Sequence, residues 1–429
     1  MKPVSAAELV VILRANARYN RGLPGGRRAL LQDRDFSGLD LTGMDFTQAD
    51  LTGSNLRGAH AADTVWIGAT AAGCDFTDAD LSRADFTRAV LCGSSLRGAL
   101  LFDAVFLQAD LRPGFLAERD RGGVFERRQV GMRDTATDLS GACLSGANLR
   151  RAQLDGVAAA QTDFTDAVMT RANLKGAQMR GAQFGGSILE DCTLDNADLT
   201  GADFRQAILL GADLGSARLD GVSLAGTLRS QPAGRTAPQI GGLERALAQH
   251  RDWLDSLGKA GRRLDLAAVD LRGTGLLRGA VLSMADLGRA VLYQLDLSGL
   301  RMHAGRAPGA DFRLAELSGA DLRGSDLTGA LFARANGYRA DLSALPLDGN
   351  GALATVLRGA NFRYADFREA NFAGCDLTGA DFRKADLTGT DFTGATLTGA
   401  DFTGAIGFAR SAPAPWARGG RELRRPAAS

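Results

Sequence analysis

The sequence predicts an all-β solenoid in two blocks, each preceded by a short amphipathic capping α-helix. Three observations lead to this fold class. A five-residue repeat runs through most of the chain, the composition is rich in glycine (55 of 429 residues) and poor in aromatic residues (6%), and two similar helical segments each precede a block of repeats. A period of five fits neither the two-residue alternation of a strand nor the 3.6-residue turn of a helix. It fits a turn-rich coil with five residues on each side.

Large apolar residues occupy every fifth position in three stretches. They fill fourteen of sixteen such positions in residues 36–111, seventeen of eighteen in 139–224 and twenty-three of twenty-six in 277–402. A small residue usually stands two positions before each of these central residues. We expect both to face inward and the other three residues to face water, since alternating large and small side chains fill a narrow tube without voids. Four sides make a twenty-residue coil, and successive coils stack at about 4.8 Å.

Many repeat units share one motif, an alanine, an acidic or amide residue and then the apolar centre. Clear copies are Ala380-Asp381-Phe382 and Ala400-Asp401-Phe402. On these units the chain resembles the bacterial pentapeptide-repeat family, over about seven tenths of its length. The resemblance implies a right-handed quadrilateral β-helix. It implies little chemistry, because most members of the family look like scaffolds.

Residues 5–21 and 242–257 are predicted to form amphipathic helices. Ser5 followed by Glu8 makes a capping box at the start of the first helix. The two segments are alike in sequence, with Asn16 at the place of His250, and each is followed by paired arginines and then the repeat. We expect each helix to cover the open backbone edge of the first coil. His250 is then a packed or edge-bonding residue rather than a catalytic or metal-binding one.

Interruptions of the repeat predict the domain boundaries. The expected parts are a first domain of residues 1–228 (coils 36–111 and 139–224 with a loop at 112–138), a linker at 229–238, a second domain of residues 239–408 and a disordered basic tail at 409–429. The loop is long enough to be functional. Residues 346–355 preserve the frame of the repeat, so they are expected to form a degenerate coil.

Opposite charges nearly cancel over the whole chain, with 50 Lys and Arg against 49 Asp and Glu. This balance argues against a nucleic-acid binder that works through bulk positive charge. The charges are nevertheless segregated, because residues 36–111 carry ten acidic and four basic residues. The solenoids are therefore predicted to be acidic and their attachments basic.

Motifs for catalysis are missing from the sequence. We predict no catalytic, cofactor-binding or metal-ligating residues, no cofactor and no enzymatic activity, because the five Cys and three His lack ligand spacing and no phosphate-binding loop occurs. Cys74, Cys192 and Cys375 take the small inward position of the repeat. No apolar stretch approaches eighteen residues, so we expect a cytoplasmic protein without membrane insertion.

The predicted function is a non-catalytic protein-interaction scaffold with a partner of unknown identity and no direct contact with nucleic acid. Residues 112–138 and the basic tail are the candidates for partner specificity. An enzyme with an unrecognised site is a further hypothesis, but it needs a cavity that the repeat does not leave.

The alternative is a DNA-duplex mimic that binds and modulates DNA gyrase or topoisomerase, since some members of the family resemble a duplex in width and charge. Residues twenty apart stack, which predicts a column of Asn361, Asp381 and Asp401. A parallel column of Arg363 and Arg383 partly cancels its field. A mimic needs uncompensated carboxylates along most of a face, because phosphate charge on DNA is dense.

Overall fold

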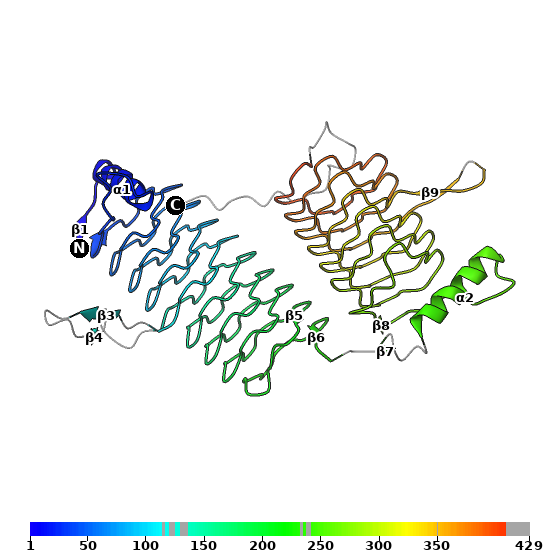
Figure 1. Ribbon diagram of the computed structural model, residues 1–429, viewed down its shortest axis with the longest axis horizontal. Helices are drawn as coiled ribbons and strands as arrows, with labels where there is room; N and C mark the ends of the chain where they lie inside the picture. Colours follow the sequence, from blue (N-terminus) through cyan, green and yellow to red (C-terminus); the bar gives the residue numbers. More distant parts are fainter. Residues whose placement is uncertain are drawn as a thin grey trace. The chain divides into compact units, whose positions relative to one another are not determined.

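The computed structural model describes residues 1–113, 116–119, 125–128, 136–231, 235–236, 242–349 and 351–408 (Figure 1). The chain divides into two compact units, residues 1–231 and 232–429. In each unit a helix precedes a stack of coils. The basic tail of the sequence analysis, residues 409–429, lies outside the described residues.

Parallel backbone bridges between residues twenty apart hold the coils together. Asp45 pairs with Val65, and Asp50 pairs with Thr70. The bridging residue directly precedes the apolar centre, and one bridge falls on every five-residue side, so each coil has four sides. The N–H of each centre donates to the bridging residue of the next coil, as from Leu51 to the carbonyl of Thr70 at 2.8 Å.

The predicted period and stacking are right, but the described residues contain little continuous strand and no closed sheet. Each side bends through a two-residue turn, so a single bridging residue remains paired with the neighbouring coil. Two-residue parallel pairs form at the ends of the units: β1 (Lys2–Pro3) with β2 (Arg34–Asp35), β5 (Ile208–Leu209) with β6 (Leu228–Arg229), and β7 (Arg235–Thr236) with β8 (Val269–Asp270). β7 comes from the segment expected to be a linker, and it pairs within the second unit.

The inward positions are buried as the repeat predicts. The apolar centres and the small residues two before them make up one apolar core in each unit. Aromatic centres stack from coil to coil, with ring centroids 4.6 Å apart for Phe362 and Phe382 and 5.0 Å apart for Phe382 and Phe402. The tube is therefore filled by its own side chains.

The second residue of most turns adopts a left-handed backbone conformation. Its φ is 71° at Gly53 and 59° at Arg83. Glycine takes this conformation without strain, which explains much of the glycine content of the chain. Pro113 occupies this second turn position in its five-residue side, but its pyrrolidine ring fixes φ near −65°. The coil cannot close its turn there, and the chain leaves the solenoid.

The chain returns to the first solenoid at Thr137. Across this insertion the bridges join residues 43 apart, Ser95 with Asp138 and Asp110 with Gln153, so the coils continue in register. β3 (Leu116–Arg119) and β4 (Phe125–Arg128) form an antiparallel pair within the insertion (Figure 1). The rest of the segment expected to be a loop, residues 114–115, 120–124 and 129–135, lies outside the described residues.

The prediction of a degenerate coil at residues 346–355 is wrong, because these residues belong to an inserted hairpin. β9 (Leu345–Pro346) and β10 (Ala352–Leu353) pair antiparallel and project from the coils as a hairpin (Figure 1). The bridges step by thirty residues here, from Asp326 to Val356. The hairpin adds ten residues, which equal two repeat units, and the frame of the sequence therefore hides it.

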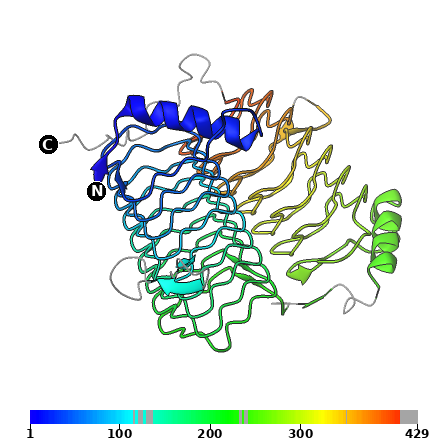
Figure 2. The ribbon, with the colours of Figure 1, turned by 60° about the vertical axis from the view of Figure 1, so that its left-hand side comes forward.

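Helices α1 (Ala6–Asn20) and α2 (Leu243–Asp255) lie against the first coils of their units, as Figure 2 shows for α1. The Ser5 hydroxyl accepts from the N–H of Glu8 at 3.2 Å and starts α1. The Asn16 amide accepts from the N–H of Ala29 at 2.9 Å and donates to the carbonyl of Thr47 at 2.8 Å. These bonds tie the buried face of α1 to the first coils.

The same contacts recur at α2. His250 Nδ1 accepts from the N–H of Leu264 at 3.1 Å, at the place where Asn16 accepts from Ala29. Arg263 Nε donates to the carbonyl of Met284 at 2.6 Å, as Arg28 Nε does to Gln48 at 2.7 Å. His250 is buried, and it makes an edge bond to the coil as the sequence predicts.

Candidate functional site

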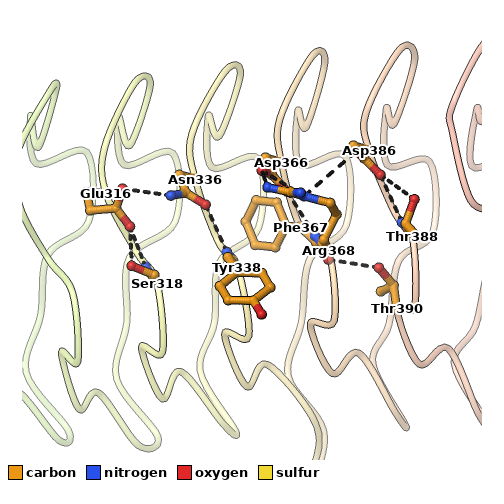
Figure 3. A network of polar contacts seen from close by, with 10 residues as sticks. All are labelled: Glu316, Ser318, Asn336, Tyr338, Asp366, Phe367, Arg368, Asp386, Thr388 and Thr390. Carbon is orange, nitrogen blue, oxygen red and sulfur yellow. Dashed lines mark hydrogen bonds and ion pairs between the residues drawn. The ribbon is translucent and has the colours of Figure 1, made fainter.

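One outward face of the second unit carries two groups of polar contacts, one around Glu316 and Asn336 and one around Asp366 and Asp386 (Figure 3). The residues that precede the apolar centres stack along it in the order Glu316, Asn336, Asp366 and Asp386. Their side-chain oxygens accept from the backbone N–H two residues later, at 3.0 to 3.1 Å. Each of these polar side chains therefore stabilises the turn that directly follows it.

Arginines on this face pair with the stacked acids. Arg368 lies 2.6 Å from Asp366 and 3.8 Å from Asp386, so it joins two coils. The hydrogen bond from Arg368 holds the pKa of Asp366 below its usual value. On the neighbouring side Arg383 lies 2.6 Å from Asp381 and 3.5 Å from Asp401. The arginine column expected to offset the acidic column does so through direct ion pairs.

Two tyrosines face outward beside these arginines. We define the Tyr–Arg surface as Arg334, Tyr338, Arg339, Tyr364 and Arg368. The guanidinium carbon of Arg339 lies 4.9 Å from the centre of the Tyr338 ring, that of Arg368 lies 5.8 Å from it, and that of Arg334 lies 4.5 Å from the Tyr364 ring. Such cation–π contacts order the long side chains. Tyrosine and arginine are the residue types that most often anchor protein interfaces.

The sequence analysis missed the Tyr–Arg surface. The sequence contains a sign of it, because the chain has only four tyrosines and two of them take outward positions: Tyr338 directly follows the inward Gly337, and Tyr364 directly precedes the inward Ala365. An aromatic side chain at an outward position is an exception in this repeat, and such exceptions mark candidate contact surfaces.

The first unit carries acids without ion pairs. Asp45 and Asp85 each accept from the backbone N–H two residues later at 2.8 Å, and Asp50 accepts in the same way at 3.1 Å. Within the described ranges none of these three carboxylates forms an ion pair, whereas Asp63 lies 2.6 Å from Arg83. Asp45 and Asp85 lie on one side two coils apart, since Asp45 bridges to Val65 and Val65 bridges to Asp85. This face of the first coils is therefore acidic.

Three of the five cysteines lie in the apolar core. Cys74, Cys192 and Cys375 are buried at inward positions, and all five cysteines are free. Burial raises the pKa of the Cys74 and Cys192 thiols to about 12 each. A thiol needs a lowered pKa to act as a nucleophile, so these thiols do not suit that role.

The Nε2 atom of His303 lies 2.7 Å from the Asp321 carboxylate. Across the described residues no group of three His, Cys, Asp or Glu side chains is placed to hold a metal ion. The helices of the described part of the chain are also too short or too polar to span a bilayer.

Comparison with known sequences gives one match. The sequence model described as pentapeptide repeats matches residues 27–112, 135–226, 315–349 and 354–406 in overlapping copies. Together these copies cover more than half of the chain. No curated protein matches the chain.

Solved structures give weak likenesses. The pentapeptide repeat protein Rfr23 from the cyanobacterium Cyanothece 51142 is 24% identical, with 33% of this chain and 90% of that chain covered and a TM-score of 0.25. HetL, a pentapeptide repeat protein involved in heterocyst differentiation regulation in Nostoc sp. strain PCC 7120, is 21% identical, with 94% and 98% covered and a TM-score of 0.16. Full-length QnrB1, a plasmid-mediated fluoroquinolone resistance protein, is 21% identical, with 54% and 99% covered and a TM-score of 0.26.

Proposed function

Because this chain belongs to the pentapeptide-repeat family, whose members fold as right-handed β-helices, we propose that it is a non-catalytic protein-interaction scaffold of the cytoplasm. One observation carries the proposal. The interior of both solenoids is filled by apolar centres and small residues. Groups that can bind a partner therefore lie on the outer faces, and stacked repeats make such faces rigid and extended.

The proposal includes the domain organisation. Residues 1–228 and 239–408 act as two rigid blocks joined through residues 229–238, and residues 409–429 form a basic tail. α1 and α2 act as caps that cover the exposed backbone edge of the first coil of each block. The matching bonds of Asn16 and His250 to the coils support this role, because open edges invite association between sheets.

Two surfaces are the proposed determinants of partner specificity. The first is the insertion between Pro113 and Thr137, which leaves the coils in register and is therefore dispensable for stacking. The second is the Tyr–Arg surface of the second unit. The tail from residue 409 supplies additional basic charge.

Partner capture with variant chains tests the proposal. One variant lacks residues 114–136 and carries Pro113→Gly, which restores the five-residue step and a residue that accepts positive φ. A second combines Tyr338→Ser with Arg339→Ser. We expect the intact chain to retain a specific protein from a lysate of its source and at least one variant to lose it. Arg358→Ser, on another side of the same coils, is the matched control and should retain the partner.

Two results would contradict the scaffold proposal. If neither the intact chain nor the control retains a specific protein, the outer faces do not serve as binding surfaces. If both variants retain the partner with unchanged affinity, the two surfaces have been assigned wrongly. Circular dichroism of each variant separates a lost partner from a lost fold.

A duplex mimic that acts on DNA gyrase or topoisomerase is the second candidate function. The carboxylates of Asp45, Asp50 and Asp85 support it, because they lack ion pairs within the described residues. The arginine pairing on the second unit weighs against it, since Arg368 and Arg383 neutralise the stacked acids there. A mimic would therefore work through the first unit.

A supercoiling assay tests this candidate. The intact chain should inhibit gyrase or protect it, and the triple substitution of Asp45, Asp50 and Asp85 by Asn should weaken the effect. The same number of substitutions at paired acids, Asp366→Asn, Asp381→Asn and Asp321→Asn, is the control. An intact chain with no effect on supercoiling would exclude the mimic while leaving the scaffold proposal untouched.

A further inference from the structure

A pocket of about 390 Å³ lies between α2 and the first coils of the second unit. Arg251, Leu254 and Asp255 line it from the helix, and Ser283, Arg301 and His303 line it from one side of two successive coils. Its volume lies in the range of small-molecule sites. Two guanidinium groups, one imidazole and one hydroxyl thus converge on a single hollow beside a helix.

The two arginines are not engaged elsewhere. Within the described residues neither the Arg251 nor the Arg301 guanidinium makes a hydrogen bond or an ion pair. Most arginines on the coils, by contrast, pair with an acid, as Arg306 does with Asp286 at 3.6 Å. Two guanidinium groups without an ion pair in the described residues therefore line the pocket together with one carboxylate, that of Asp255.

Asp321 explains why Arg301 stays unpaired. It bridges to Arg301 in the next coil, so it is the nearest acid in the same column. Its carboxylate lies 2.7 Å from both His303 and Arg323. Although burial opposes it, these two partners lower the pKa of Asp321 to about 2. The carboxylate is thus committed to other donors, and Arg301 remains available.

The first unit has the same helix-on-coil arrangement without these cations. The register fixed by Asn16 and His250 aligns Arg251 with Ala17. Val65 bridges to Asp45 just as Arg301 bridges to Val281, so Arg301 corresponds to Val65 and His303 to Ile67. A helix can therefore be held against the coils without either arginine and without the histidine. Packing of α2 against the coils therefore does not explain the presence of Arg251, Arg301 and His303.

We propose that this pocket binds a small organic oxyanion, a phosphate monoester or a carboxylate, that also carries a hydroxyl group. Arg251 and Arg301 bind the oxyanion, since the guanidinium fork matches the geometry of phosphate and carboxylate oxygens. The Ser283 hydroxyl donates a further hydrogen bond. Asp255 accepts from the ligand hydroxyl, which disfavours a purely anionic ligand. Binding here is independent of any protein partner and goes beyond the scaffold role.

Isothermal titration of the full chain tests the proposal. The probes are inorganic phosphate, glycerol 3-phosphate and glycerate, each at constant ionic strength set with sodium chloride. We expect glycerol 3-phosphate or glycerate to bind more tightly than inorganic phosphate. The variants Arg301→Val and Arg251→Ala carry the residues of the first unit, and each should weaken binding at least about tenfold.

Arg306→Val is the matched control. Arg306 lies in the same coil as Arg301 and also occupies a bridging position, but it faces another side and pairs with Asp286. Its substitution should leave binding unchanged. Arg251→Ala changes an exposed helix residue and keeps the test valid if Arg301→Val fails to fold. The proposal is overturned if no probe binds at about 10 mM, or if Arg251→Ala and Arg301→Val bind as tightly as the intact chain.

Discussion

Phe367 fills the space that a side chain at Gly337 would need in the preceding coil. A Cβ added at Gly337 would overlap the Phe367 ring, and the N–H of Gly337 donates to the carbonyl of Asp366 at 2.7 Å. The ring packs edge-on against Phe362, with centroids 5.1 Å apart. A repeat position without its apolar centre is thus compensated by a large residue one coil later.

Gly337→Ala should destabilise the second unit. The added methyl group has no room beneath Phe367, and overpacking of a filled core costs about 1–3 kcal/mol. Urea denaturation gives the free energy of unfolding. Gly275→Ala is the control, because no heavy atom lies within 4 Å of a Cβ there. Equal stability of the two variants would show that Phe367 does not fill the space beside Gly337. In the Gly337→Ala background, the further substitution Phe367→Leu should restore part of the lost stability.

Phe382→Asp should prevent correct folding of the second solenoid. The side chain is buried between Phe362 and Phe402, so the variant places a carboxyl group without partners in an apolar tube, at a cost of several kcal/mol. Phe382→Leu keeps an apolar side chain and should cost less than about 2 kcal/mol. Thermal melts followed by circular dichroism compare the two. An unchanged melting temperature in Phe382→Asp would show that the centre does not face inward.

His250→Asn should preserve the stability of the second unit, because Asn16 makes the equivalent bond in the first unit. His250→Ala should lose about 1–3 kcal/mol, since the buried N–H of Leu264 is left without an acceptor. Urea denaturation of the two variants decides the matter. If both variants are equally stable, the hydrogen bond of His250 to the coil does not contribute to the stability of the second unit.

The stability of the second unit should fall as the pH drops below about 6.5. Burial, with a contribution from nearby Arg263, lowers the pKa of His250 from its ordinary value of 6.5. The unfolded chain then binds a proton that the folded chain does not, so stability is present above pH 6.5 and is lost as the pH falls. Denaturation at several pH values should show this loss in the intact chain and a smaller loss in His250→Asn. Identical pH profiles would contradict it.

The thiols of the buried Cys74 and Cys192 and of the half-buried Cys92 should react slowly in the folded chain. Burial raises the pKa of Cys74, Cys92 and Cys192 to about 12 each, so little thiolate exists at pH 8. A thiol reagent should therefore modify the cysteines quickly in denaturant and slowly without it. Rapid modification of Cys74 in the folded chain would show that the inward position is open to solvent.

The stacked fold follows from the sequence because the repeat itself assigns each residue to the inside or the outside. The positions of the inserted hairpins are harder to predict from the sequence. The hairpin of β9 and β10 adds two full repeat lengths and leaves the frame unchanged, whereas Pro113 breaks the frame through its fixed φ. Reading prolines at the left-handed turn position would have located the start of the first insertion.

Contacts on the outer faces depend on the distance between coils as well as on the repeat. A residue after one centre meets the residue before the next centre of the same side eighteen positions later, as His303 meets Asp321 and Arg358 meets Asp376. This spacing could have paired His303 from the sequence alone. The pocket beside α2 could not be found in this way, because it depends on how a helix packs against two coils.

The measurement that tests the scaffold account most directly is the affinity of the captured partner for two purified chains, the intact one and the variant that lacks residues 114–136 with Pro113→Gly. The account predicts that the variant keeps its melting temperature within a few degrees and loses affinity by at least about tenfold, or that Tyr338→Ser with Arg339→Ser does so in its place. Unchanged affinity in both folded variants would contradict the account.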